Sequence, residues 1–247
     1  MTTTLVLGTA DLRQALTAVR VHACTDKEQP ELHRIRLLVH PQNVAVVATD
    51  RFTMALAIAS VWEDHGIEPC TVDLLPDDVT KILAIFKAGK ESGGDDPEFK
   101  LRLDIHEQQL EVTDCSGLID GRALRVPRVP ADGGDTLAGA PGMIAGAHTG
   151  AISMLADMTV NGDSLARFKV AANAYHAPVT IESRRGMLLT RCGESFLGLM
   201  MPRKLGDGEL MDARHWAEDW DRRLPGLIET ARKAAEDDRA DLSGGES

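Results

Sequence analysis

Five side chains in the sequence have the types that acid–base or nucleophilic chemistry uses. They are two histidines, two aspartates and a cysteine: His40, His106, Asp50, Asp114 and Cys115. A histidine can act as a general base, a carboxylate can orient it, and a thiolate can attack as a nucleophile. An enzyme is therefore one hypothesis for this chain.

The positions of these residues within the chain favour a structural role. The stretches "RLLVHPQNVAVVATD" and "RLDIHEQQLEVTD" can be aligned so that the two histidines coincide and the two aspartates coincide. Apolar residues alternate with polar ones on both sides of each histidine, which is typical of β-strands. A residue that recurs at the same turn of an internal repeat serves the fold of each copy. We therefore predict that the protein is not an enzyme.

The sequence also lacks the usual patterns of metal and cofactor sites. The four cysteines lie far apart with no Cys-x-x-Cys pair, and no histidines stand at zinc-ligand spacing. No glycine-rich phosphate loop is present. We predict reduced thiols, no metal and no cofactor.

Composition and charge restrict the class of protein. Of the 247 residues, 43% are hydrophobic but only 4% are aromatic, so we expect a large aliphatic core. The net charge of −11 would argue against a nucleic-acid partner, but residues 206–247 hold 12 acids and 6 bases. That segment carries −6 and the rest only −5, so DNA stays a candidate partner. Because a basic leader and an apolar run of membrane length are both absent, we expect a cytoplasmic protein without a membrane partner.

Helical segments recur together with the strands, at an offset of 66 residues for the strands and 67 for the helices. In "TADLRQALTAVRV" and "PDDVTKILAIFK", apolar residues follow the i, i+3, i+4, i+7 spacing of one helix face. A third segment, "NGDSLARFKVAANA", has a weaker stripe and precedes further strand-like stretches. The apolar positions are Leu12, Ala15, Leu16 and Val19, then Val79, Ile82, Leu83 and Phe86, then Leu165, Phe168 and Ala172. The chain therefore contains three copies of a unit made of a helix and several strands.

These units predict an α+β fold with antiparallel sheets and helices packed on one face. Residues 1–132 hold two complete units and are predicted to form one domain, and residues 158–205 are predicted to form a partial domain. The Gly/Ala-rich residues 133–157 are predicted to be a linker. Residues 206–247 are predicted to be an acidic, helical tail.

A series of motifs resembles the bacterial DNA sliding clamp family, the beta subunit of DNA polymerase III. The motifs occur in the family's order: "ATDRFTMALA", "VDLLPDDVTKILAIF", "LIDGRALRVPRVP", "NGDSLARFKVAANAYHAPVTIES" and "LMMPRKL". The resemblance implies DNA-clamp-like repeats and a processivity factor that tethers a DNA polymerase or repair proteins to DNA. A family chain has three domains, each a pair of such units, and closes as a dimer, whereas this chain has about one and a half domains. A homo-oligomer is therefore implied, while closure of a ring stays open.

In this family, helices line a hole through which duplex DNA passes without being read for sequence. Cationic side chains on the outward helix faces would neutralise phosphates there. An ordinary solvated helix face is the alternative interpretation of the same side chains. The candidate DNA contacts are Arg13, Arg20, Lys81, Lys87, Lys90, Arg167 and Lys169.

The family also binds short peptide motifs of DNA polymerases, the clamp loader and repair proteins in an apolar pocket. The resemblance places that pocket where the Ala-Thr-Asp turn, the start of the second helix and the Met-Pro end of the third unit meet. The candidate pocket residues are Thr49, Arg51, Phe52, Thr53, Met54, Pro76, Val79, Leu199, Met200, Met201 and Pro202. The alternative is that the methionines only fill the core. A second hypothesis for function is a decoy or regulator that binds clamp-dependent proteins without encircling DNA.

Overall fold

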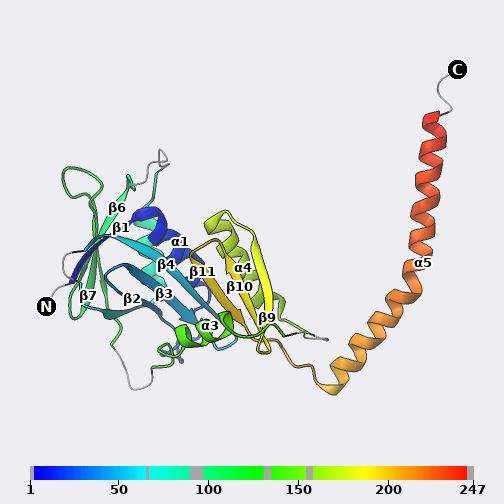
Figure 1. Ribbon diagram of the computed structural model, residues 1–247, viewed down its shortest axis with the longest axis horizontal. Helices are drawn as coiled ribbons and strands as arrows, with labels where there is room; N and C mark the ends of the chain where they lie inside the picture. The colour runs from blue at the N-terminus through cyan, green and yellow to red at the C-terminus, as the bar shows by residue number, and fades with distance from the viewer. Residues whose placement is uncertain (1–2, 65–66, 90–96, 131–134, 154–157, 244–247) are drawn as a thin grey trace. The chain divides into compact units, whose positions relative to one another are not determined.

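The computed structural model describes residues 3–64, 67–89, 97–130, 135–153 and 158–243. The chain forms two compact bodies, Met1–Pro202 and Arg203–Ser247. The second body contains the predicted helical tail, α5 (Asp207–Ser243). The first body contains β1 (Thr3–Gly8), α1 (Thr9–Arg20), β2 (Ile35–Val39), β3 (Asn43–Thr49), β4 (Thr53–Asp64), β5 (Cys70–Leu74), α2 (Pro76–Ile85), β6 (Lys100–Ile105), β7 (Gln109–Asp114), β8 (Ala123–Pro127), α3 (Ala140–His148), α4 (Gly162–Tyr175), β9 (Val179–Arg184), β10 (Met187–Cys192) and β11 (Phe196–Met200) (Figure 1).

The three predicted units are present, and we call them repeats 1, 2 and 3. Repeat 1 is β1, α1 and β2–β4, repeat 2 is β5, α2 and β6–β8, and repeat 3 is α4 and β9–β11. In each repeat the helix is followed by three strands that pair as an antiparallel meander. The predicted α+β class with antiparallel pairing is confirmed.

Repeats 1 and 2 exchange their first strands. β1 pairs with β6 of repeat 2, and β5 pairs with β2 of repeat 1. β1 also pairs with the far end of β4, which joins the two meanders into one sheet. Neither repeat therefore completes its part of the sheet with its own strands.

Repeat 3 continues the sheet of repeat 1. β11 pairs with the first half of β4, where Leu199 stands opposite Met54 and Met200 opposite Thr53. The sheet thus contains strands from both sides of the predicted linker, and Met1–Pro202 forms one compact body. The boundaries proposed for independent domains stay a prediction.

Three helices pack on one face of this sheet, in a row with α1 between α2 and α4. Their apolar faces meet alternate strand residues such as Val46, Ala57 and Leu103 in the main core. The positions between these residues point to the other face, where α3 covers β3, β4, β10 and β11. Within the described residues, no helix combines the length and apolar character that a membrane span needs.

The position of α3 differs from the prediction, because its residues belong to the segment interpreted as a linker. Glycines and a proline interrupt its apolar pattern, so the sequence alone shows little helical periodicity. Four hydrophobic residues among those described in the segment are nevertheless buried: Leu137, Ala140, Ile144 and Ala147. They pack against Val47, Met54, Leu189 and Leu199 of β3, β4, β10 and β11.

Candidate functional site

The histidines, through their backbones, and the aspartates, through their side chains, make equivalent turn contacts in repeats 1 and 2. The backbone N–H groups of His40 and His106 each donate to a carbonyl three residues on, at 2.9 Å in both repeats. The carboxylates of Asp50 and Asp114 each accept from the N–H two residues later, at 3.1 Å in both repeats. Burial raises the pKa of the Cys115 thiol, which disfavours a reactive thiolate. Within the described ranges, no group of three or more His, Cys, Asp or Glu side chains could hold a metal ion.

The structure brings the Ala-Thr-Asp turn and the Met-Pro end of repeat 3 together. Met201, the residue after β11, donates its backbone N–H to the Phe52 carbonyl at 2.8 Å. The Phe52 side chain is 68% exposed and that of Met201 is 47% exposed. The two residues thus place apolar side chains on the surface at the junction of β4 and β11.

The turn between β3 and β4 has a fixed shape. Arg51 has a φ of 76°, a left-handed conformation that is uncommon for a residue other than glycine. Thr49 Oγ1 donates to the Thr53 carbonyl at 2.7 Å, and the Asp50 carboxylate accepts from the Thr53 N–H at 2.7 Å. Several hydrogen bonds therefore determine the backbone conformation of the turn that carries Phe52.

Arg167 connects the turn to the helix row. It lies on α4, whose first turn is capped by the Asn161 side chain, which accepts from the Asp163 N–H at 2.8 Å. The Arg167 guanidinium forms an ion pair with Asp50 and donates to Thr53 Oγ1 at 2.8 Å. Burial alone would raise the pKa of Asp50, but the bonds from Thr53 and Arg167 outweigh it and the pKa is lowered. Asp50 therefore stays ionised in the folded protein.

The other predicted pocket residues are covered. Val79 and Met200 belong to the main core, and Pro76 is half-buried in the first turn of α2. Met54 and Leu199 lie under α3. The buried Thr49 and Thr53 form the turn, and Pro202 is half-buried. The exposed part of the predicted pocket is thus Arg51, Phe52 and Met201.

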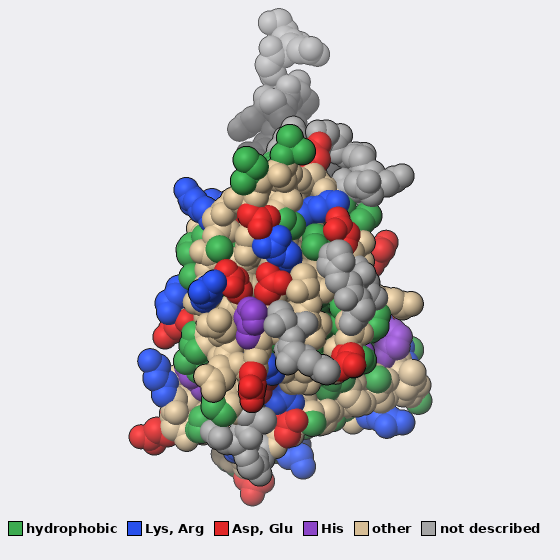
Figure 2. Space-filling model, turned by 90° about the vertical axis from the view of Figure 1, so that its left-hand side faces the viewer, with side chains coloured by type: hydrophobic (Ala, Val, Ile, Leu, Met, Phe, Trp, Pro, Cys, Tyr) green, Lys and Arg blue, Asp and Glu red, His purple; other side chains and the backbone are tan. Residues whose placement is uncertain are grey.

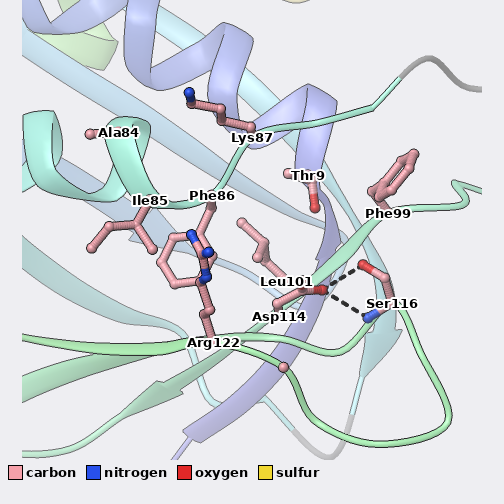
Figure 3. Close-up of a pocket in the computed structure, with 11 residues that line it drawn as sticks. Thr9, Ala84, Ile85, Phe86, Lys87, Phe99, Leu101, Asp114, Ser116 and Arg122 are labelled. Carbon is pink, nitrogen blue, oxygen red and sulfur yellow. Dashed lines mark hydrogen bonds between the residues drawn. The ribbon is translucent and has the colours of Figure 1, made fainter.

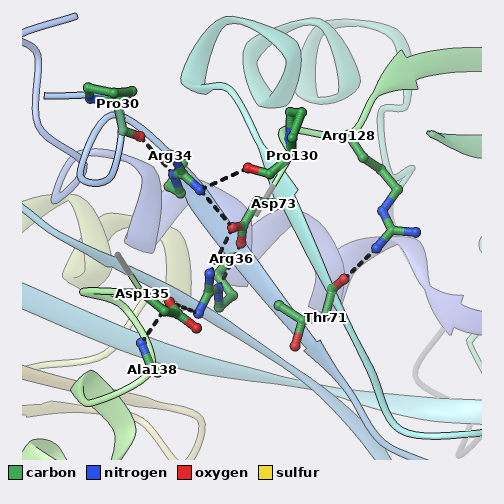
Figure 4. A network of polar contacts seen from close by, with 9 residues as sticks. All are labelled: Pro30, Arg34, Arg36, Thr71, Asp73, Arg128, Pro130, Asp135 and Ala138. Atoms are coloured by element: carbon green, nitrogen blue, oxygen red, sulfur yellow. Dashed lines mark hydrogen bonds and ion pairs between the residues drawn. The ribbon is translucent and has the colours of Figure 1, made fainter. Parts of the chain in front are cut away.

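A buried ion-pair network fixes the segment that leads into α3 (Figure 4). Arg36 of β2 donates two hydrogen bonds to Asp73 of β5, at 2.7 and 2.8 Å. These bonds are the main reason why the pKa of the Arg36 guanidinium is raised. The same guanidinium binds Asp135, whose carboxylate also accepts from the Ala138 N–H at 3.1 Å. Arg34 adds a second cation, 3.2 Å from Asp73. The start of the α3 segment is thereby tied to β2 and β5.

The arginines predicted to contact DNA have partners within the chain. Arg13 donates to the carbonyls of Leu83 and Phe86, where α2 ends. Arg20 donates to Thr80 Oγ1 at 2.9 Å, and Arg167 binds the turn described above. Sequence spacing placed these side chains on polar helix faces, but those faces contact neighbouring elements.

The predicted lysines are more accessible. Lys81, Lys87 and Lys169 are exposed, and Lys81 makes an ion pair with Asp78 at 2.8 Å. Lys90 lies outside the described residues. Among the candidate DNA contacts that the structure describes, Lys81, Lys87 and Lys169 are therefore the ones with exposed side chains.

His22 is a buried polar residue at the site that the sequence did not indicate. Its side chain is fully buried after the end of α1, with its ring centroid 4.9 Å from that of Phe168 on α4. Burial, helped by the positive charge of Arg167, lowers the pKa of His22 to about 3. Neither ring nitrogen has a hydrogen-bond partner within the described part of the chain. The junction of α1 and α4 therefore contains a neutral imidazole.

The fold is that of bacterial sliding clamps. The DNA polymerase III beta subunit of Thermotoga maritima aligns with a TM-score of 0.58 and 12% identity over 85% of this chain and 67% of that chain. The sliding clamp of Bacillus subtilis gives 0.57 and 11% over 82% and 64%, respectively. The beta subunit of Borrelia burgdorferi, solved in complex with a natural product, gives 0.56 and 10% over 82% and 63%.

These comparisons define a divergent chain with a clamp-like fold. The chain spans about two thirds of the length of these clamps. The sequence itself matches no protein-family model and no curated protein. At 10–12% identity, the likeness extends to the fold alone.

Proposed function

We propose that the protein is a sliding-clamp-like factor that tethers a DNA polymerase or repair protein to duplex DNA, without sequence specificity and without enzymatic activity. The observation that carries this proposal is the row of three equivalent helices on one face of a continuous antiparallel sheet, in the fold of the solved clamps. In this proposal the helix row faces DNA, and the protein acts in the cytoplasm as a homo-oligomer.

The partner site in this proposal is centred on Phe52 and Met201. A partner's short peptide, from a polymerase, clamp loader or repair protein, would add apolar side chains to these two residues. The thioether of Met201 suits variable partners because it is flexible and polarisable. Phe52→Ala and Met201→Ala should each weaken the binding of a labelled clamp-binding peptide, while Met211→Ala, an exposed methionine on α5, should leave it unchanged.

DNA binding is tested at the exposed lysines, because the arginines already support the fold. Lys81, Lys87 and Lys169 are replaced together by glutamate, and Lys27, in an exposed loop, is replaced as the control. Binding to unrelated duplexes should weaken equally for the triple variant, and the slope of log K against log salt should fall by about one unit per lost phosphate contact. Unchanged affinity and slope would remove the helix row as a DNA surface.

One observation favours the decoy or regulator as a second candidate. Arg13, Arg20 and Arg167 are held by groups of the chain itself, so few cations remain for phosphates. Under this alternative the protein binds clamp-dependent partners through the Phe52 and Met201 surface alone. Peptide binding that depends on Phe52, in a protein with no measurable duplex affinity at low salt, would favour it over the clamp.

A further inference from the structure

α3 covers an apolar strip of the sheet where repeats 1 and 3 meet (Figure 1). Met54 of β4 stands directly opposite Leu199 of β11, and both side chains lie under the helix. Val47 of β3 and Leu189 of β10 extend the strip on either side. Without α3 the strip would be open to solvent, and a continuous apolar surface in solvent is typical of a binding site.

The covered strip continues into the exposed partner surface formed by Phe52 and Met201. The bond from the Met201 N–H to the Phe52 carbonyl extends the pairing of β11 with β4 beyond the last paired residues. Side chains two residues apart on a strand point to the same face of the sheet, so Met201 lies on the same face as Leu199. Leu199 is buried, whereas Met201 is exposed. α3 is therefore the boundary between the covered and the exposed part of one apolar surface.

The sequence of α3 makes it a weak helix. Its nine residues include Gly142 and Gly146, and glycine loses more conformational entropy in a helix than alanine does. Gly139, the N-cap residue, provides no side-chain hydrogen bond to the first turn. A helix of fewer than about 12 residues is marginal in water by itself. α3 thus depends on its contacts with the sheet, and its buried side chains are only Ile144 and two alanines.

The chain is tied to the sheet on both sides of this helix. Before α3, the Asp135 carboxylate forms an ion pair with Arg36 of β2. After α3, the Ser153 N–H donates to the Ser183 carbonyl at 2.9 Å, and the hydroxyl oxygens of the two serines also lie 2.9 Å apart. A helix that is released between such anchors stays near its site and competes for it at a high effective concentration. Weak contacts are then enough to keep the strip covered.

A bound peptide and α3 would need the same apolar strip. We propose that α3 is an autoinhibitory helix, which must leave the strip before a partner peptide can place apolar side chains on Met54 and Leu199. With α3 in place, the peptide contacts Phe52 and Met201 alone and binds weakly. With α3 displaced, the peptide covers the whole apolar surface, and its apparent affinity is reduced only by the fraction of molecules in which the helix is closed. This role rests on the proposed partner site and adds a means of regulating it.

Repeat 2 offers a peptide a different kind of surface. On the β6 and β7 side, acidic and basic side chains are interspersed where the atoms are described (Figure 2). An open pocket of about 450 Å³ lies between the end of α2 and the turn after β7 (Figure 3). Its lining includes Phe86, Asp114 and Arg122, and no lining residue comes from β3, β4, β10 or β11, the strands under α3. Binding at this pocket would not change when α3 is released.

Two substitutions in α3 shift its opening in opposite directions and leave the strip itself unchanged. Gly142→Ala strengthens the helix, because a Cβ at this position meets open space. Ile144→Asp releases the helix, and Met143→Asp is its control because Met143 is exposed. The dissociation constant of the labelled clamp-binding peptide is measured for the full chain and each variant. We expect Gly142→Ala to raise it about two- to fivefold, Ile144→Asp to lower it at least about tenfold, and Met143→Asp to change it less than about twofold.

Hydrogen exchange in α3 gives a second measurement, which distinguishes displacement of the helix from binding beside it. Saturating peptide should speed the exchange of the amides of residues 140–148, because it holds the helix open. In the free protein these amides should exchange through a local opening, while the amides of β4 and β11 stay protected. If Ile144→Asp loses its native circular dichroism spectrum, Gly142→Ala and this exchange measurement decide the matter.

Several other results would overturn the autoinhibitory role. An affinity that ignores the α3 substitutions, or slower α3 exchange with bound peptide, would show that α3 does not compete. Ala84→Trp places a bulky side chain in the pocket of Figure 3, and loss of binding in this variant would locate the peptide there. Binding that ignores α3 but still depends on Phe52 would leave the proposed function standing, whereas no binding to any variant would refute both the partner site and its regulation.

Discussion

His22 should make the stability of the protein fall steeply in mildly acidic solution. In the folded chain its pKa is about 3, against 6.5 for an exposed imidazole. Between these values the unfolded state binds a proton that the folded state does not bind. The unfolding free energy that the neutral His22 contributes is therefore fully present above pH 6.5 and is lost as the pH falls towards 3.

The size of the effect follows from the two pKa values. Lowering the pH from 7.5 to 5.0 should cost about 2 kcal/mol of unfolding free energy through His22 alone. With a urea m-value of about 2 kcal/mol/M, this shifts the midpoint by roughly 1 M. The assay is urea unfolding followed by circular dichroism at both pH values and at one protein concentration.

His22→Leu isolates the contribution of the imidazole. Leucine has a similar volume and cannot be protonated, so its loss of stability on acidification should be smaller by about 2 kcal/mol. Any packing change made by the substitution is common to both pH values and cancels in this comparison. Equal losses in the two proteins would show that the imidazole is not held neutral, and the reasoning from its burial would be wrong.

Three further predictions use denaturant unfolding with matched controls. Gly198→Ala should cost about 1–3 kcal/mol, because its Cβ would collide with the buried Phe168 ring; Gly142→Ala, with open space in α3, should gain about 0.5–1 kcal/mol. Asp73→Asn should cost about 3–5 kcal/mol by leaving two buried arginines without their carboxylate, whereas Asp135→Asn should cost at most about 1 kcal/mol. Ile144→Asp should release α3 and speed hydrogen exchange there, while the exposed Met143→Asp should not. If a variant and its control changed stability or hydrogen exchange equally, the contact proposed for that pair would be wrong.

The repeated units could be predicted because two strong periodicities occur in each. Val44 and Val46 alternate with outward positions in a strand, and Leu12, Leu16 and Val19 mark one face of a helix. These patterns depend on local geometry alone, so they survive at low sequence identity. The third repeat could be predicted from the strands that follow α4 as much as from α4 itself.

Contacts between elements could not be predicted in the same way. The spacing of Arg13 and Arg20 shows that they share a helix side, but it does not show that α2 packs against that side. Asp73 sits in an apparently ordinary strand, and its role depends on two arginines far away in the sequence. Phe52 and Met201 could be brought together only through the resemblance to clamps, because 149 residues separate them.

The exchange of first strands between repeats 1 and 2 has a consequence for how such a chain could arise by duplication. A single repeat alone would leave β2 without the neighbour that β5 provides, and its own first strand without the neighbour that β6 provides. Two separate copies could satisfy both needs by trading first strands about a two-fold axis, as domain-swapped dimers do. The covalent pair in this chain is equivalent to such a dimer with its subunits fused. Cutting the backbone between β4 and β5 should therefore give two fragments that fold only in each other's presence.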